Sequence, residues 1–292
     1  MNWLMQQEPL VRMGAFAGIF AAMALWELLA PRRELHVGKG YRWLNNLAVV
    51  VLDTVLVRIA FPTAAVGIAL FAEAEGWGLF HWAELPYWLA VVLGVLVLDF
   101  AIWAQHVMFH AVPALWRLHR MHHADLDFDV TTGLRFHPIE ILLSMVIKAG
   151  VVVALGAPAV AVLLFEVLLN ATSMFNHGNV RLPAGLDRVL RWFVVTPEMH
   201  RVHHSWYPNE TNSNFGFNLP WWDRLFGTYL AQPRDGHERM TIGINLFRDP
   251  RELRLDRMLF QPFHGPTHSY PINAREPRAS RPGEGPGAET TR

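Results

Sequence analysis

The sequence of 292 residues contains no cysteine and has few charged residues of either sign. Without cysteine the chain can form neither disulfides nor thiolate zinc sites, and it cannot ligate an iron–sulfur cluster. The 25 basic residues equal the 25 acidic residues in number and form no long basic run, which argues against a nucleic-acid partner. The chain also lacks a G-x-G-x-x-G fingerprint, so no sequence signature for a dinucleotide is present.

Apolar residues are abundant instead: 52% of the chain is hydrophobic and only 17% is charged. About 20 consecutive apolar residues are needed to cross a bilayer. Four stretches approach or exceed this length, at 13–30, 47–71, 87–104 and 139–169. One such stretch can be a buried core helix, but four together predict an all-α, multi-pass integral membrane protein with about four embedded helical segments.

The charges of the connecting segments predict how the chain is oriented. The connection after the first stretch contains four basic residues, Arg32, Arg33, Lys39 and Arg42. The connection 72–86 has no Lys or Arg and three Glu. By the positive-inside rule the first connection is cytoplasmic, and the chain then returns to the cytoplasmic side near Gln105.

The fourth stretch, 139–169, is long for a single span. Near its middle lie Gly150, Gly156 and Pro158, residues that weaken a helix interior. We expect a hairpin or a broken helix here, because a single crossing would separate the two histidine segments described next.

Histidine occurs 15 times, and the pattern His-x-x-His-His occurs twice, as "HRMHH" at 119–123 and "HRVHH" at 200–204. Chance gives about 0.04 occurrences in a chain of this length and composition. On a helix the three rings share one face, as a metal site requires. Thr196 and Pro197 supply a cap and a first position for the second helix. "HVMFH" adds His106 and His110 one helical turn apart.

Eight clustered imidazoles are twice what one tetrahedral zinc ion uses, so we expect two metal ions. The open alternatives are a solvated or pH-sensing helix face, axial haem ligation, and a zinc or transport site without chemistry. A redox metal centre explains the repeat best. Imidazole alone does not distinguish iron from zinc.

Five segments resemble, in order and spacing, the motifs of the fatty acid hydroxylase / sterol desaturase superfamily of membrane di-iron oxygenases. They are "DFAIWAQHVMFH", "LWRLHRMHHADLDFDVTTGLRFHP", "FNHGN", "TPEMHRVHH" and "NLPWWDRLFGTYL", within 99–230. The resemblance implies a histidine-box core at 99–230 inside one membrane domain, 1–272. The remaining tail, 273–292, is rich in Pro, Gly, Arg and Glu and is expected to be disordered.

Carried over by position, the resemblance implies nine metal ligands: His106, His110, His119, His122, His123, His177, His200, His203 and His204. Four further residues are expected to orient these ligands or to act as possible ligands: Asp99, His137, Asn176 and Asn179. Asp99 in particular is expected to fix the tautomer of a histidine. Five histidines lack motif context and are expected at the surface: His36, His81, His237, His264 and His268.

The resemblance implies a cofactor of two Fe²⁺ ions, O₂ as co-substrate, and hydroxylation or desaturation of a lipid. Fatty acyl chains, sterols, ether lipids and carotenoids all remain open as substrates. Electrons must come from a separate ferredoxin or cytochrome-type donor, and Arg117, Arg120 and Arg201 are candidates for its docking surface. The alternative from another class is a non-catalytic membrane metal-binding or transport protein, which would need polar residues along the spans.

A reporter fused after Ala171 tests the predicted orientation. We expect it to be cytoplasmic, because the broken fourth stretch returns the chain to the side of the basic connection. Accessibility to membrane-impermeant labels in intact and permeabilised cells measures this. A reporter found on the opposite side would contradict the hairpin orientation.

Overall fold

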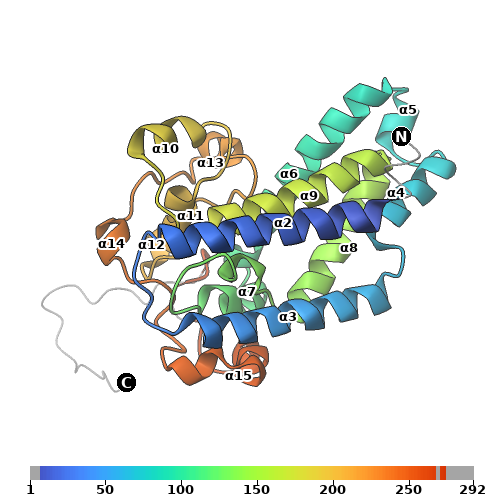
Figure 1. Cartoon of the computed structure of the whole chain (residues 1–292). Helices are drawn as coiled ribbons and strands as arrows, with labels where there is room; N and C mark the ends of the chain where they lie inside the picture. The colour runs from blue at the N-terminus through green and yellow to red at the C-terminus, as the bar shows by residue number, and fades with distance from the viewer. Residues whose placement is uncertain (1–6, 268–269, 274–292) are drawn as a thin grey trace, which may run out of the picture.

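The structure is a computed structural model that describes residues 7–267 and 270–273. Its regular elements in this part of the chain are helices, and the strand-like contacts are two isolated bridges, Pro31 with Val180 and Ser205 with Ile242. Long helices form a bundle, and short helices cover one end of it (Figure 1).

The long helices are α2 (Glu8–Leu29), α3 (Lys39–Ala60), α4 (Ala64–Ala74), α6 (Tyr87–Ala111), α8 (Pro138–Leu155) and α9 (Ala159–Asn176). The helices at the histidine end are α7 (Pro113–His123), α10 (Ala184–Leu190), α11 (Pro197–His203), α12 (Pro208–Thr211), α13 (Trp221–Leu225), α14 (Gly236–Arg239) and α15 (Leu255–Phe260). Three short 3-10 turns, η1 (Thr132–Leu134), η2 (Pro250–Leu253) and η3 (Gln261–Phe263), lie among them, and α5 (Leu79–Trp82) lies at the opposite end.

Five helical stretches of the described chain are long and apolar enough to cross a membrane: 8–29, 39–82, 87–111, 138–155 and 159–176. The first two and the 87–111 stretch correspond to three of the four expected segments. The fourth expected segment is divided into two helices, which accounts for the fifth stretch. The all-α membrane fold predicted from the sequence is confirmed.

The expected segment 47–71 is not one helix. It is divided near Pro62: α3 ends at Ala60 and α4 begins at Ala64. Proline has no backbone N–H and disfavours helical geometry in the residue before it. After this break α4 packs against α8 and α9, so that its Ala65 and Ala69 are completely buried.

The expected break in 139–169 is confirmed. Helix α8 ends at Leu155, Gly156 follows in the left-handed conformation with φ of 63°, and Pro158 precedes the first residue of α9. Glycine tolerates this conformation at a helix end, and proline suits the start of the next helix. The end of α9 therefore returns to the side on which α8 began, where the two His-x-x-His-His segments meet.

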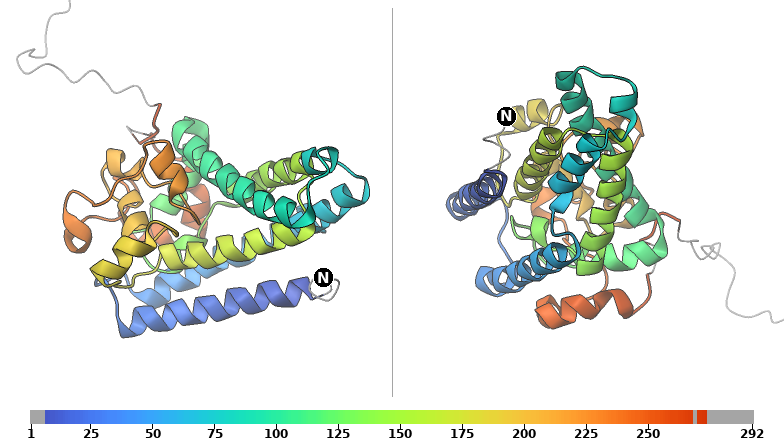
Figure 2. Two further views of the ribbon diagram at one scale, coloured as in Figure 1. Left: turned by 90° about the horizontal axis from the view of Figure 1, so that it is seen from above. Right: turned by 90° about the vertical axis from the view of Figure 1, so that its right-hand side faces the viewer.

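The basic connection between α2 and α3 lies at the same end as the histidines. The backbone N–H groups of Arg33 and His36 donate to the side chains of Asn179 and Asp127, respectively. The acidic connection and α5 lie at the far end of the bundle, as Figure 2 shows from above. The relative arrangement of the basic and acidic connections agrees with the charge pattern, whereas the cytoplasmic assignment stays a prediction.

An apolar core joins the long helices beneath the histidines. Leu98 and Ile102 of α6 pack with Val162 and Phe165 of α9 and with Val152 of α8. The predicted single membrane domain 1–272 stays a prediction. The tail expected to be disordered lies, apart from residue 273, outside the described residues.

Gly156→Ala tests the break between α8 and α9. A Cβ at this position would lie 2.2 Å from the carbonyl oxygen of Trp77, and the left-handed backbone adds strain. We expect the free energy of unfolding to fall by roughly 1–3 kcal/mol. Thermal unfolding of the protein in detergent measures the change.

The matched control is Gly150→Ala, because Gly150 lies inside α8 and its Cβ would meet nothing within 4 Å. This variant should be neutral or stabilised by up to about 1 kcal/mol. Equal loss of stability in both variants would contradict a special role for Gly156.

Candidate metal centre

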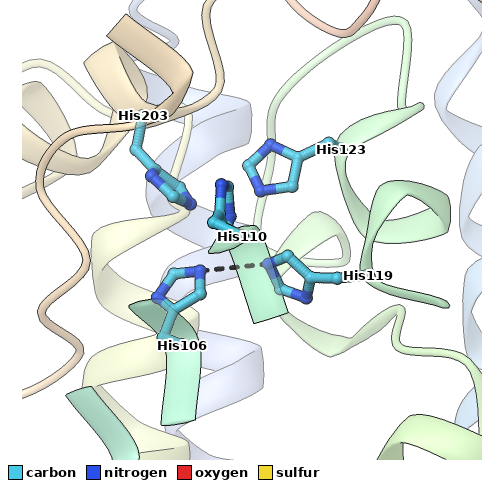
Figure 3. Close-up of side chains that lie close together, drawn as sticks. All are labelled: His106, His110, His119, His123 and His203. Atoms are coloured by element: carbon cyan, nitrogen blue, oxygen red, sulfur yellow. Dashed lines mark hydrogen bonds between the residues drawn. The ribbon is translucent and has the colours of Figure 1, made fainter. Parts of the chain in front are cut away.

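Nine buried histidines form two adjacent groups. The first contains His106, His110, His119, His123 and His203, and the second contains His122, His177, His200 and His204. Within each group the prospective ligand atoms lie within 4.8 Å of one another. None of the nine residues is more than 3% exposed. Figure 3 shows the first group, with rings from α6, α7 and α11 directed at a common space.

The two His-x-x-His-His segments divide their rings between the groups in opposite ways. In α7, His119 and His123 enter the first group and His122 the second. Around α11, His200 and His204 enter the second group and His203 the first. Each segment thus gives its i and i+4 rings to one group and its i+3 ring to the other, so both segments are needed to build either group.

Hydrogen bonds on the outer side set the tautomers of four rings in the first group. The Nδ1 atoms of His106 and His203 lie 2.7 Å from the carbonyl oxygens of Phe215 and Ser213. A carbonyl oxygen can only accept, so each Nδ1 carries the hydrogen and each Nε2 presents a lone pair.

The other two rings are fixed by side chains. His119 Nδ1 lies 2.7 Å from the carboxylate of Glu140, and His110 Nδ1 lies 3.0 Å from the amide oxygen of Asn212. Asn212 uses its nitrogen to donate to Tyr270, which identifies its oxygen as the acceptor toward His110. The Nε2 atoms of all four rings therefore face the common space with lone pairs.

These lone pairs have no donor within the described structure. The Nε2 atoms of His106 and His119 are 3.0 Å apart, and the Nε2 atoms of His110, His123 and His203 have no hydrogen-bond partner among the described residues. Lone pairs repel at this distance unless a cation lies between them. The arrangement of the first group therefore fits a bound metal ion.

The second group also presents lone pairs to a common space, and an outer hydrogen bond sets the tautomer of one of its rings. His177 donates from Nδ1 to the carbonyl oxygen of Ser173 at 2.8 Å, so its Nε2 faces the group with a lone pair. That Nε2 lies 3.3 Å from His122 Nε2 and 3.2 Å from His204 Nε2. The Nδ1 atoms of His122 and His204 and both ring nitrogens of His200 lack partners in the described part of the chain.

The nitrogen spacings suit metal coordination. Two nitrogens each about 2.1 Å from one ion are roughly 3.0 Å apart at an angle of 90° and roughly 3.4 Å apart at the tetrahedral angle. The three observed Nε2 separations of 3.0, 3.2 and 3.3 Å fall in this range. Five nitrogens in the first group exceed a tetrahedral zinc site, and imidazole sets of this size suit iron and other transition metals.

Burial keeps these imidazoles neutral. It lowers the pKa of His119 and of His177 to about 3. Burial, followed by repulsion from neighbouring imidazoles, also holds the pKa of His122 and of His204 well below the ordinary value. Neutral imidazole is the form that binds a metal, so the site is ready for ligation at physiological pH.

A buried ionic network holds the segment that follows "HRMHH". Arg42 of α3 donates to both carboxylate oxygens of Asp125 at 2.9 and 2.7 Å and also contacts Asp129. Burial raises the pKa of Asp125, but the guanidinium groups of Arg42 and Arg135 outweigh it and hold this pKa below its usual range. The network fixes the end of α7, where His122 and His123 lie.

Glu27 of α2 connects this segment with the one that carries His177. Its Oε1 accepts from the backbone N–H of Val130 at 2.7 Å and of Asn179 at 2.8 Å. The carboxylate is buried, so it replaces water as the partner of both amides. Helix α2 thereby fixes the distance between the loop after α7 and the loop after α9.

The four residues expected to orient ligands form hydrogen bonds with groups other than the nine histidines. Asp99 accepts from Trp222 Nε1 at 2.8 Å rather than from a histidine, which joins α6 to α13. His137 caps α8 by accepting from the N–H of Ile139. Asn176 donates to the carbonyl of Phe217. Asn179 bonds the backbone of Arg33 in both directions.

The expected docking role of Arg120 and Arg201 is wrong, because both side chains are completely buried. Arg120 donates to the carbonyl oxygens of Gln261, His264 and Pro266 and holds the C-terminal segment against α7. Arg201 forms an ion pair with Glu198 at 3.3 Å. Arg117 is half-buried and donates to the Pro262 carbonyl.

The five histidines without motif context have four different outcomes. His36 and His264 are exposed as expected, and His81 is half-buried. The expectation is wrong for His237, which is 7% exposed and lies 2.9 Å from a carboxylate oxygen of Glu198. His268 lies outside the described residues.

Sequence reasoning missed Glu140 and Asn212 as partners of the ligands. Glu140 is an acidic residue at the start of an apolar stretch, the same signal that singled out Asp99. Asn212 has no such signal, because it lies in a polar loop whose path over the histidines depends on the whole fold.

Comparison with known proteins gives a family and several relatives. Residues 91–228 match the fatty acid hydroxylase family. Ornithine lipid hydroxylase OlsE of Rhizobium tropici is 31% identical over 222 residues, which are 73% of this chain and 65% of that protein. Alkylglycerol monooxygenase of Xenopus tropicalis is 30% identical over 62% of this chain and 40% of its own length.

Cholesterol 25-hydroxylase of Rattus norvegicus is 28% identical over 57% of this chain and 63% of its own length. The chain thus spans less than two thirds of each of these relatives. No solved structure matches the chain.

Glu140→Ala tests whether the outer carboxylate orients His119. Without an acceptor at Nδ1 the ring loses its fixed tautomer, and we expect metal affinity to fall roughly 10–100-fold. Competition with a metal chelator measures the affinity. Glu140→Gln keeps an acceptor oxygen and should lose much less. Equal affinities in wild type and Glu140→Ala would contradict the role.

Proposed function

Because this chain belongs to the fatty acid hydroxylase superfamily, we propose that it is a membrane-bound non-haem di-iron oxygenase that hydroxylates a lipid. The observation that carries this proposal is the convergence of nine buried, neutral imidazoles into two adjacent groups with unpaired lone pairs. Relatives named as hydroxylases or monooxygenases favour hydroxylation over desaturation.

Two iron ions fit the two groups, with His106, His110, His119, His123 and His203 holding one and His122, His177, His200 and His204 holding the other. When bound, the irons supply the activation of O₂ for oxidation of an unreactive C–H bond. The chain's own contribution is to fix the ring orientations through the outer acceptors, so that little reorganisation accompanies the reaction.

Phenylalanine side chains keep the surroundings of the rings dry. Phe136 stacks on His122 with 4.4 Å between ring centroids, and Phe217 lies 5.0 Å from His106. Phe128 packs on both His177 and His204. This apolar lining excludes water that would compete with the lipid for reactive species, and it suits a substrate that enters from the bilayer.

Electrons come from a separate donor in this proposal, of ferredoxin or cytochrome type. The cysteine-free chain cannot hold an iron–sulfur cluster and has no dinucleotide fingerprint. The active centre lies on the cytoplasmic side if the positive-inside rule holds, which gives a cytoplasmic donor direct access to the helices that cover the histidines.

The transport alternative needs a polar path through the spanning helices. One set of charges on these helices instead pairs internally: Glu166 of α9 accepts from Lys148 of α8 at 2.5 Å and lies 2.7 Å from Arg12 of α2, which also pairs with Glu8 at 2.9 Å. Such a neutralised set stabilises helix packing, which favours the enzyme.

Elemental analysis together with a lipid oxidation assay tests the proposal. Protein expressed with ample iron should carry about two irons per chain, one for each group, and should consume O₂ and hydroxylate lipid when a reductant is supplied. Replacing His122 and His203 together removes one ligand from each group and should abolish both metal binding and product.

His264→Ala is the matched control, because this ring is exposed and belongs to neither group. It should keep the metal content and activity of the wild type. Metal-loaded protein that moves ions across the bilayer but oxidises no lipid would overturn the oxygenase proposal in favour of transport.

A further inference from the structure

A second polar site lies beside the metal centre, on the outer side of α11. A cavity of about 440 Å³ opens between the end of α2, the start of α10, α11 and α14. Figure 1 shows these elements at one end of the bundle. Its lining includes Arg32, Arg181, Leu182, Ala184, Asp187, Glu198 and His237. None of the nine histidines of the metal centre lines it.

The charges around this cavity have a positive balance. Four guanidinium groups, of Arg32, Arg181, Arg191 and Arg201, pair with three carboxylates, of Asp187, Glu198 and Glu238. The count of four cations against three anions leaves a surplus of one positive charge before any contribution from His237. An anionic ligand would balance this surplus.

Two of the lining side chains are positioned to meet a ligand. Arg32 is 12% exposed and uses Nε and Nη1 to bond Glu198 at 2.7 Å and Glu238 at 2.6 Å. Arg181 is 68% exposed and lies 3.6 Å from the same oxygen of Glu238. Glu238 thus occupies, from the rim, the place between two arginines that an incoming anion would take.

His237 supplies an independent sign of a missing partner. It is 7% exposed, and its Nε2 lies 2.9 Å from Glu198. Its Nδ1 is buried without a hydrogen-bond partner among the residues that the structure describes. A buried nitrogen in a polar cavity needs a partner, which a bound ligand can provide.

The level of the cavity points to a lipid headgroup as this ligand. Helix α2 has 22 residues and is therefore about 33 Å long, close to the roughly 30 Å of a bilayer's hydrocarbon core. Arg32 follows its end by three residues, and Arg181 follows the end of α9 by five. Both arginines thus lie at headgroup depth.

The rim of the cavity continues into an apolar surface. Helix α10 provides Ala184 and Asp187 to the cavity and exposes Leu186 and Val189 next to them. Trp192 and Phe193 follow, and each of these two side chains is more than half exposed. Tryptophan and other apolar side chains favour the membrane interface, so lipid tails can extend along this surface from a headgroup in the cavity.

We propose that this cavity binds the anionic headgroup of a membrane lipid through Arg32 and Arg181. On the proposed oxygenase function, this lipid is the substrate. Two wall residues connect the cavity with the clustered histidines, which supports this assignment. Glu198 lies on α11 together with His200, and Leu182 follows His177 by five residues. The bound headgroup displaces Glu238 from the two arginines and satisfies His237.

Binding of short-chain lipids to the full-length protein in detergent tests the site directly. Dioctanoylglycerol phosphate should bind at least 10-fold more tightly than neutral dioctanoylglycerol. Arg181→Gln should reduce this affinity about 10-fold without affecting folding, because the side chain is exposed. Arg32→Gln should also reduce this affinity about 10-fold. Glu238→Gln should increase the affinity, because it removes the carboxylate that competes with the lipid for the two arginines.

Arg188→Gln is the matched control, since Arg188 is exposed on α10 but does not line the cavity. Equal binding of both lipids, or unchanged affinity in Arg181→Gln, would overturn the proposal. Inorganic phosphate that binds as tightly as the phosphorylated lipid would also overturn it and leave a free-anion site.

Turnover separates the substrate assignment from the headgroup site. With the phosphorylated lipid, Arg181→Gln should raise KM about 10-fold and leave kcat and metal content unchanged. Headgroup-selective binding without oxidation of any lipid would remove the oxygenase function and retain the binding site. Equal KM values in wild type and Arg181→Gln would overturn the assignment of the bound lipid as substrate.

Discussion

The structure depends on the convergence of neutral imidazole lone pairs in a buried space. Such an arrangement is unfavourable by itself, because the lone pairs repel and burial prevents their protonation. It persists through acceptors placed behind the rings: the carbonyls of Ser173, Ser213 and Phe215, the carboxylate of Glu140 and the amide of Asn212. These acceptors come from separate parts of the chain, so the ligand geometry is a property of the whole histidine end.

The fold meets this requirement by returning the chain repeatedly to one side of the bundle. The break at Gly156 and Pro158 directs α9 back, which brings His177 beside α7 and allows α11 to face it. Ionic contacts then fix the distances, with Arg42 joining α3 to Asp125 and Glu27 joining α2 to the loops after α7 and α9. The first two spanning helices thus contribute no ligand and yet position the segments that do.

The sequence predicts features that are local in the chain, and it does so here for the histidine pattern, the helix break and the cap at Thr196. Spacing within a helix fixes which rings share a face, but it does not predict that α7 and α11 divide their rings between two groups. The burial of Arg120 and Arg201 could not be predicted from the sequence either. An arginine beside a histidine has the same local sequence pattern whether its side chain faces solvent or backbone carbonyls. Asn212 and His237 acquire their positions from loops whose paths only tertiary packing determines.

Helix α11 separates two environments of opposite character. Residues two apart on a helix point about 200° from each other, so His200 faces the other clustered histidines while Glu198 faces the polar cavity. The inner side is lined by phenylalanine, whereas the outer side carries the charged groups of the cavity. A rearrangement of the ion pairs of Glu198 when the cavity is filled would act on the same short helix that holds His200 and His203. The two sites therefore share one short helix, so the proposed headgroup binding would act directly on the positions of His200 and His203.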